Sequence, residues 1–337
     1  RVPAELFFGS TSNAVSRFSA SGIWRPASGV LYSLAMGRRT NPKIQRIKGV
    51  AAVTTLRLIA FLPYAVNRCI ASLFGALLSR LPTEARRVSR INLALCYPQL
   101  DETRRHQLAR QSLQESARNT FEIALFWRHP EQGLKRIVAV DGDAPLRQAV
   151  HEGKPVMILA PHLGCWEVLN FWLATEFGLH AMFAPSGLPE VDDLIRSGRE
   201  HFDSTMYPTT ARGVAGLVRA MKKGGLTAIL PDQVPDRRSG RHAPFFGQPA
   251  YTGTLACKLI RQTGAVTFMA WARRLPNGKG FEICVRPADP QVADDDLDTA
   301  LTAMNRSIAH LIDEEPAQYL WSYKRFRRPP PGHQAPY

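Results

Sequence analysis

Beyond residue 100 the chain alternates short apolar runs with amphipathic segments. Residues 101–127 repeat their apolar side chains at roughly helical spacing, which predicts one long helix. Apolar runs predict strands at 136–140, 156–160, 180–184, 226–230, 265–271 and 281–286. Amphipathic segments predict helices at 167–177, 191–201, 213–223, 252–263 and 297–313. Strands and helices that alternate at this spacing favour an α/β fold, with a mixed, mostly parallel central sheet covered by helices on both faces.

The N-terminal third has a different pattern. Residues 56–81 form its most apolar stretch, although three arginines, a proline and an asparagine interrupt it. Because a membrane-spanning helix needs about 20 mostly apolar residues, these interruptions favour a helix that lies in the lipid headgroup layer. A short helix packed on the domain is the alternative. We expect a basic leader at 1–50, an apolar and basic membrane-associating helical segment at 51–98, an α/β domain at 99–328 and a tail at 329–337.

The composition is that of a globular chain with an unusual charge. Hydrophobic residues make up 45% and charged residues 21% of the 337, which is enough for a sizeable core. The formal net charge is +15, and the first 100 residues alone hold 14 Lys and Arg against Glu5 and Glu84. This balance favours an anionic partner, whether nucleic acid, an anionic membrane face or an acidic protein. The five cysteines are scattered and include no C-x-x-C pair, which fits a reduced cytosolic environment.

The candidate chemistry begins at His162. This histidine follows the uninterrupted apolar run 156–160, which is typical of a central strand, so it lies at the carboxyl edge where α/β sheets bind ligands. Glu167 can approach the ring only if His162 is in the turn, Gly164 helps the chain to bend, and Glu167 is in the first turn of the next helix. Glu167 would then accept from Nδ1 and leave Nε2 to face a substrate hydroxyl. The alternative is a structural turn histidine beside a carboxylate that favours a helix start.

Three further features bear on the site. Asp232 and Gln233 directly follow another apolar run, in a proline-rich loop that is equally suited to structure or to a site. Arg199 lies in an amphipathic stretch, where a solvated helix charge is the usual explanation. At 318–329 aromatic residues interleave with basic ones, which fits either nucleic-acid binding or a tail that wraps the core.

Four segments in this order resemble one known family. They are Ala160-Pro-His-Leu-Gly-Cys-Trp-Glu167, Pro231-Asp-Gln-Val-Pro235, Pro244-Phe-Phe-Gly-Gln-Pro249 and Gln318-Tyr-Leu-Trp-Ser-Tyr-Lys-Arg-Phe-Arg-Arg-Pro329. Asn92-Leu-Ala-Leu-Cys-Tyr-Pro98 adds to the likeness. From about residue 50 to 328, the chain resembles the late (secondary) acyltransferases of lipid A biosynthesis in Gram-negative bacteria, within the wider lysophospholipid acyltransferase superfamily.

The resemblance implies transfer of a fatty acyl chain from acyl carrier protein to a hydroxyl of a glucosamine-based lipid A precursor, at the cytoplasmic face of the inner membrane. His162 is then the general base and Glu167 its partner, and Arg199 donates to the oxyanion, together with backbone N–H groups at the following helix start. Gly164, Asp232 and Gln233 belong to the oxyanion and substrate-binding site, where Asp232 and Gln233 shape the cleft. Because the thioester is already activated, no metal or other cofactor is implied. The expected partners are acyl carrier protein, the lipid A precursor and an anionic membrane surface, and no nucleic acid.

Other functions remain open at this point. Another glycolipid or a lysophospholipid is an alternative acceptor. A covalent thiol enzyme could use Cys165 with His162. A serine hydrolase is disfavoured because the chain has no G-x-S-x-G elbow. A non-enzymatic membrane- or nucleic-acid-binding protein would account for the charge, but not for three polar residues at the carboxyl ends of predicted strands.

Overall fold

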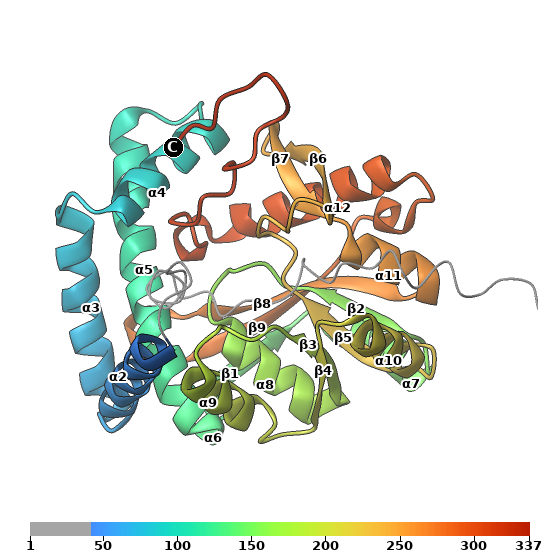
Figure 1. Cartoon of the computed structure of the whole chain (residues 1–337), viewed down its shortest axis with the longest axis horizontal. Helices are drawn as coiled ribbons and strands as arrows, with labels where there is room; N and C mark the ends of the chain where they lie inside the picture. The colour runs from blue at the N-terminus through green and yellow to red at the C-terminus, as the bar shows by residue number, and fades with distance from the viewer. Residues whose placement is uncertain (1–41) are drawn as a thin grey trace, which may run out of the picture.

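The computed structural model describes residues 42–337 (Figure 1). The expected leader at 1–50 therefore lies mostly outside the described residues. The described part begins with four helices, α2 (Pro42–Ala60), α3 (Tyr64–Arg80), α4 (Glu84–Cys96) and α5 (Glu102–Arg128). Next come α6 (Pro130–Leu134), β1 (Ile137–Asp141), α7 (Ala144–His151), β2 (Val156–Leu159), α8 (Trp166–Phe177), β3 (Leu179–Phe183), α9 (Pro189–Arg199) and β4 (Ser204–Pro208). The last elements are α10 (Ala211–Met221), β5 (Leu226–Ile229), β6 (Gly240–Phe245), β7 (Gln248–Gly253), α11 (Leu255–Thr263), β8 (Val266–Arg274), β9 (Phe281–Pro287) and α12 (Leu297–Glu314).

Seven strands form one central sheet in the order β1-β9-β8-β2-β5-β3-β4. Strands β8, β2, β5, β3 and β4 run parallel to one another, whereas β9 and β1 run the opposite way because β8 and β9 pair antiparallel. The remaining two strands, β6 and β7, form a separate hairpin. The predicted mixed, mostly parallel sheet is confirmed, and β2 lies at its centre.

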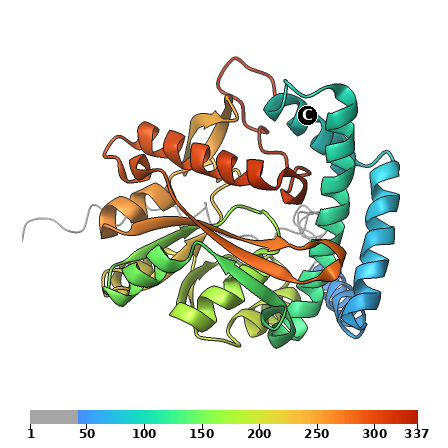
Figure 2. The same ribbon diagram turned by 180° about the vertical axis from the view of Figure 1, so that it is seen from behind.

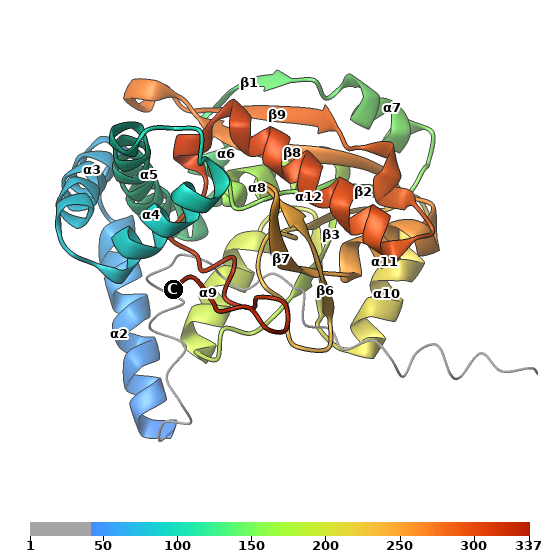
Figure 3. The ribbon, with the colours of Figure 1, turned by 90° about the horizontal axis from the view of Figure 1, so that it is seen from above.

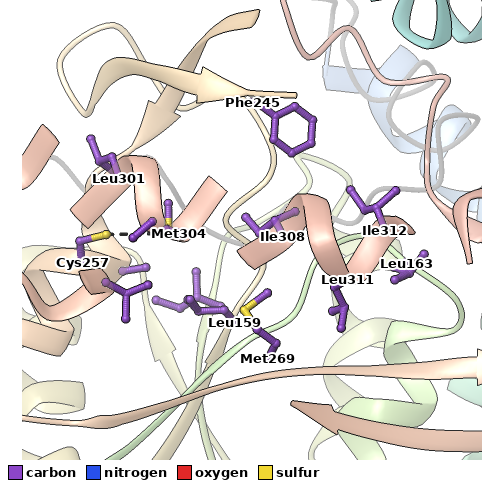
Figure 4. Packing of buried hydrophobic residues seen from close by; sticks show 14 of the residues in the cluster. Leu159, Leu163, Phe245, Cys257, Met269, Leu301, Met304, Ile308, Leu311 and Ile312 are labelled. Carbon is purple, nitrogen blue, oxygen red and sulfur yellow. Dashed lines mark hydrogen bonds between the residues drawn. The ribbon is translucent and has the colours of Figure 1, made fainter. Parts of the chain in front are cut away.

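Helices cover both faces of this sheet (Figures 1 and 2). Side chains of α10, α11 and α12 pack in one hydrophobic cluster, and those of α7, α8 and α9 pack in the other. In Figure 4, Met304 and Ile308 of α12 lie over Leu159 and Met269 of the sheet. Leu163 belongs to the same cluster, so the loop that follows β2 is anchored in the core. All four residues of β2 are fully buried, as expected for a strand with helices on both sides.

The long helix α5 runs past the edge of the sheet and belongs to both layers. Its first half contributes Leu108 and Ala109 to the α12 side of the core. Its second half contributes residues 123–127 to the α8 side. Figure 3 shows α2, α3 and α5 grouped at one side of the sheet.

Helix α3 packs on α5 with its small and polar side chains inward. Its buried residues are Asn67, Ala71, Gly75 and Ser79. A Cβ on Gly75 would come within 2.8 Å of the Gln114 Cα, so the two helix backbones approach closely there. The large apolar side chains of α3 are exposed instead, at Val66, Ile70, Leu73, Phe74 and Leu77. This inverted pattern leaves most of an apolar face without a partner in the described part of the chain, although Phe74 packs against Phe121 of α5. None of the helices in 42–337 has the length and apolarity needed to cross a bilayer.

The structure departs from the predicted elements in several places, among them helices α6 and α7, which were not predicted. The apolar stretch 56–81 is divided between two helices, because Pro63 breaks the helical pattern and caps α3. Residues 252 and 253, predicted as helical, end strand β7. Strand β4 and the hairpin β6–β7 were not predicted, since neither has a continuous apolar run.

The C-terminal segment wraps the core. Tyr319, Trp321 and Phe326 are buried, and Asn92 donates to the carbonyl oxygens of Trp321 and Tyr323 at 2.7 Å. These three aromatic side chains are therefore unavailable to stack on nucleic-acid bases, which favours the tail interpretation.

Candidate active site

The loop after β2 holds His162 in a fixed backbone position. The N–H of Leu320 donates to the His162 carbonyl oxygen at 3.1 Å, and the N–H of Gly164 donates to the Gln318 carbonyl oxygen at 3.2 Å. On the other side, the N–H of Cys165 donates to the Ala272 carbonyl oxygen of β8 at 2.9 Å. The C-terminal segment and β8 thus clamp this loop between them.

Only glycine fits at position 164. Its φ is +63°, and a Cβ would lie 2.0 Å from the Ala272 carbonyl oxygen. The expectation that Gly164 bends the chain is thus met by the geometry. Its N–H is already bound to Gln318, so this amide is not free to donate to a substrate oxygen.

The carboxylate next to the imidazole is Asp232. Its Oδ1 lies 2.8 Å from the His162 Nδ1, and its Oδ2 accepts from the His162 backbone N–H at 3.0 Å. The predicted contact between Glu167 and Nδ1 is therefore wrong. Glu167 is in the first turn of α8 as expected, but its two carboxylate oxygens bind Arg199.

Strand pairing explains why Asp232 takes this position. Strands β2 and β5 are parallel neighbours, and Leu159 is paired with Ile229. His162 and Asp232 each lie three residues beyond that pair, so the parallel register brings them to the same edge of the sheet. The sequence contains a matching signal, since both residues follow an apolar run and a proline. The signal becomes useful only when the two strands are known to be adjacent.

The electrostatics of this pair determine which ring nitrogen carries the proton. Burial alone would raise the pKa of Asp232, but His162 and the hydrogen bonds to it lower that pKa below its ordinary value. Asp232 is therefore ionised and acts only as an acceptor, so Nδ1 carries the hydrogen. The other nitrogen, Nε2, presents its lone pair and lies 3.2 Å from the side-chain nitrogen of Gln233, which donates to it.

Glu167 and Arg199 form a second buried pair. Arg199 donates through Nε at 3.0 Å and through Nη2 at 2.6 Å, one bond to each carboxylate oxygen. Burial raises the pKa of Glu167 and lowers the pKa of Arg199 to about 10. The attraction between the two charges opposes burial in both cases, but it is the smaller effect. Arg199 is only 2% exposed. The pair ties the first turn of α8 to the end of α9 beneath the His162 loop.

A narrow cavity of about 80 Å³ lies beside the His162 ring. Phe74 and Leu78 of α3 line one wall, and Trp166 lies edge-on to the imidazole with ring centroids 5.1 Å apart. Small-molecule sites usually measure about 300–1,000 Å³. The cavity is therefore smaller than a usual site for a small molecule.

The polar wall of this cavity contains a network that the sequence patterns do not reveal. Arg274 of β8 binds Glu122 and Glu115 of α5, with Nη1 at 2.8 Å from Glu115. Gln318 bridges the backbone N–H and carbonyl oxygen of Arg274, at 2.8 and 2.9 Å. Because the neighbouring residues 318–320 also hold the His162 loop, this network links α5 to the candidate site.

Two expectations concern other chemistry. Cys165 is fully buried, and burial raises the pKa of its thiol. A protonated thiol is a poor nucleophile, so the geometry disfavours a covalent thiol mechanism. Within residues 42–337, no three His, Cys, Asp or Glu side chains lie close enough together to hold a metal ion.

Comparison with known proteins shows which family this chain matches. Residues 40–328 match the family described as bacterial lipid A biosynthesis acyltransferase. The lipid A biosynthesis lauroyltransferase of Escherichia coli K12 is 26% identical over 83% of this chain and 91% of its own length. The palmitoleoyltransferase of the same pathway and organism is 24% identical over 82% of this chain and 90% of its own length. The lipid A biosynthesis myristoyltransferase of Escherichia coli K12 is 25% identical over 86% of this chain and 88% of its own length.

Proposed function

Because the chain belongs to the family of bacterial lipid A biosynthesis acyltransferases, we propose that it moves a fatty acyl chain from acyl carrier protein to a hydroxyl of a lipid A precursor. The observation that carries the mechanism is the arrangement around His162. One ring nitrogen is held by an ionised carboxylate, and the other presents its lone pair beside a cavity lined by both apolar and polar side chains.

The proposed reaction needs one base and no acyl-enzyme. Nε2 of His162 takes the proton of the acceptor hydroxyl, and Asp232 stabilises the imidazolium that forms. The acceptor oxygen then attacks the thioester carbonyl carbon, which becomes tetrahedral. When that intermediate collapses, the carbon–sulfur bond breaks, and the departing thiolate takes the proton back from Nε2. The products are an ester and the free thiol of the carrier.

The negative oxygen of the tetrahedral intermediate needs hydrogen-bond donors. We assign this role to the backbone N–H groups of Trp166 and Glu167, which lie in the first turn of α8 and have no intrahelical acceptor. In this proposal Arg199 acts through Glu167, because the two guanidinium nitrogens Nε and Nη2 are bound to that carboxylate. Without substrate, the side chain of Gln233 donates to Nε2. When the acceptor binds, its hydroxyl replaces Gln233 as the donor to Nε2.

The thioester supplies an activated acyl group, so the proposed mechanism uses no metal or other cofactor. Acyl carrier protein is the co-substrate, and its acidic surface would be attracted by the net positive charge of the chain.

We place the enzyme at the cytoplasmic face of the inner membrane. Besides the exposed apolar face of α3, further large apolar side chains are exposed at Ile47 and Leu58 of α2 and at Phe61, which follows this helix. Arginines at 57, 68 and 80 lie in the same two helices. An apolar face flanked by basic residues fits the headgroup layer of an anionic leaflet. The same face borders the cavity beside His162 through Phe74, so the lipid acceptor could reach the base from the membrane.

The direct test is acyl transfer by the purified full chain in mixed detergent and phospholipid. The substrates are acyl carrier protein loaded with saturated acyl chains of different lengths and a tetra-acylated lipid A precursor, and products are identified by mass spectrometry. We expect an ester product with the wild type and none with His162→Ala. His151→Ala, which removes an exposed histidine from α7, is the matched control and should retain full activity.

Three results would contradict the proposal. They are wild-type rates with His162→Ala, release of free fatty acid in place of an ester, and acylation of a lysophospholipid or another glycolipid in preference to the lipid A precursor.

A further inference from the structure

A second cavity, of about 560 Å³, lies between α4 and the first turns of α5. Its basic lining comprises Arg86, Arg87 and Arg90 of α4, and Arg105 and His106 of α5, and the acidic Glu102 also lines it. We call these five basic residues and the space between them the arginine pocket. Its volume falls within the range of about 300–1,000 Å³ that is usual for small-molecule sites.

Within residues 46–337, two of these arginines have no carboxylate partner. Arg86 donates to the Arg80 carbonyl oxygen at 2.9 Å, and Arg105 donates to the Pro98 carbonyl oxygen at 3.4 Å. No acidic side chain within residues 46–337 forms an ion pair with either of them. Both are half-buried, so part of their hydration is already lost without compensation by a negative charge.

The acidic residues near the arginine pocket do not neutralise it. Glu84 binds Arg87 at 2.9 Å but also binds Lys324 at 2.6 Å. Glu102 lies 3.7 Å from Arg90 and 3.4 Å from His106, and its side chain is 74% exposed. The pocket therefore keeps a net positive charge. Planar guanidinium groups match the oxygens of a phosphate, which they bind through paired hydrogen bonds.

The arginine pocket lies at the end of the exposed apolar face of α3. Leu73, Leu77 and Leu81 follow one another at intervals of four residues and are all exposed. Pro82, the next residue, lines the pocket. A molecule that fits both features has apolar chains and an anionic head, as a phosphorylated lipid does.

The first turn of α4 borders both cavities. Ala85 lines the narrow cavity beside His162, whereas Thr83 and Arg86 line the arginine pocket. One lipid molecule could therefore place its charged head in the pocket while a hydroxylated chain reaches the base. An acidic protein would need a broad basic surface, and a concave pocket beside an apolar stripe favours the smaller ligand.

We propose that the arginine pocket binds a phosphate monoester on the headgroup of the lipid acceptor and so positions the acceptor for transfer. This inference rests on the proposed function for the identity of the lipid, but the binding itself is testable without catalysis.

The binding test uses co-flotation of the full chain with phosphatidylcholine vesicles. The vesicles contain either phosphatidic acid, which carries a phosphate monoester, or phosphatidylglycerol, in amounts that give equal surface charge. We expect the wild type to prefer phosphatidic acid by about tenfold or more, since paired guanidinium hydrogen bonds fit a phosphate monoester, whereas the attraction to surface charge is equal for the two vesicles. Arg86→Gln combined with Arg105→Gln should remove that preference and leave binding to phosphatidylglycerol.

The matched control is Arg212→Gln combined with Arg219→Gln, which removes two exposed arginines from α10 and should keep the preference. His162→Ala should keep it as well, because the base takes no part in headgroup binding. If the double glutamine variant does not fold, Arg86→Lys with Arg105→Lys replaces it and should show a partial loss. Equal binding of the wild type to both vesicles, or an equal loss in the α10 control, would overturn the proposal.

A kinetic test then separates the possible anionic partners. The KM of the Arg86→Gln, Arg105→Gln variant is measured for acyl carrier protein and for acceptors with and without headgroup phosphates. We expect a higher KM only for the phosphorylated acceptor, with kcat little changed. A higher KM for acyl carrier protein alone would assign the pocket to the carrier and refute a lipid site. Absence of transfer by the wild type would refute the proposed function, and the vesicle result would still decide whether the pocket binds phosphate.

Discussion

The carboxylate of Asp232 binds His162 twice, once through the backbone N–H at 3.0 Å and once through Nδ1 of the ring at 2.8 Å. One side chain from the end of β5 thus positions both the loop and the imidazole at the end of β2. The backbone bond holds the loop against β5, and the ring bond selects the tautomer.

Replacement of Asp232 by Asn should separate catalysis from folding. The amide can still accept from the backbone N–H, but its NH₂ group then faces Nδ1 and favours the tautomer with the proton on Nε2. We expect kcat to fall by about 10²–10⁴-fold, the usual contribution of general-base catalysis, with an unchanged circular dichroism spectrum. A kcat within a factor of two of wild type would show that Asp232 does not select the tautomer.

The same variant makes a prediction about pH. Because the folded-state pKa of Asp232 is lowered from 3.8, its ionised form contributes stability that is complete above that value and is lost as the pH falls through the folded pKa. The difference in unfolding free energy between wild type and Asp232→Asn should therefore shrink below pH 3.8. Urea unfolding at neutral and at acidic pH measures this, and a difference that grows on acidification would contradict the assignment.

Glu167 and Arg199 should behave as a unit. Removal of one partner leaves the other charge buried and unpaired, so Arg199→Met alone should destabilise the fold by about 3–5 kcal/mol. Adding Glu167→Leu should recover most of that loss, because two apolar side chains leave no buried charge. The activity should be non-additive as well: Glu167→Ala, Arg199→Ala and the double variant should all lose similar amounts of kcat. Additive losses in a double-mutant cycle would show that the two residues act separately.

Gly164 and Gly153 form a matched pair for a packing test. Both have positive φ, at +63° and +67°, but only Gly164 has a backbone oxygen where a Cβ would be placed. Gly153→Ala should cost about 1 kcal/mol, the conformational strain alone. Gly164→Ala should cost more than about 3 kcal/mol, because the Ala272 carbonyl must also move. Equal losses in urea unfolding would mean that the loop is not clamped by β8.

Cys165→Ala tests the covalent alternative. The thiol is buried, and its raised pKa leaves it protonated near neutral pH, so we expect kcat close to wild type. A steady-state transfer assay, with mass spectrometry of the intact protein to detect an acyl adduct, is sufficient. A loss of transfer as large as that of His162→Ala, or an adduct on Cys165 in the wild type, would favour the thiol mechanism.

The exposed face of α3 should control membrane binding. Leu73→Ser with Leu77→Ser removes two large apolar side chains from this face, each of which contributes about 1.5–3 kcal/mol if lipid buries it. We expect vesicle binding to weaken by at least about tenfold. Val138→Ser with Val140→Ser, on the exposed side of β1, is the matched control and should change little. If the two double variants weakened vesicle binding equally, the exposed face of α3 would have no special role in membrane binding.

The sequence predicted the parts of the site that depend on one segment. The buried run before His162 placed that residue at the end of a central strand, and Gly164 indicated a turn before the next helix. The partner of the ring was predicted wrongly because Glu167 is near in sequence, whereas Asp232 is near only through the pairing of Leu159 with Ile229. Strand order depends on the packing of the whole chain, which hydrophobic periodicity does not encode.

The arginine pocket also could not be predicted from the sequence alone. The count of charged residues showed that the positive charge lies in the N-terminal third. It did not show that several of these arginines line one pocket. Arg86 and Arg105 are far enough apart in sequence that only the packing of α4 on α5 brings them to one cavity.

The membership of α5 in both hydrophobic clusters affects how the protein unfolds. Leu108 and Ala109 anchor it on the α12 side of the sheet, and Ile123 and Phe126 anchor it on the α8 side. Neither layer can come apart without loosening a helix on which the other depends. Thermal melting should therefore be a single cooperative event, in which the two layers open together.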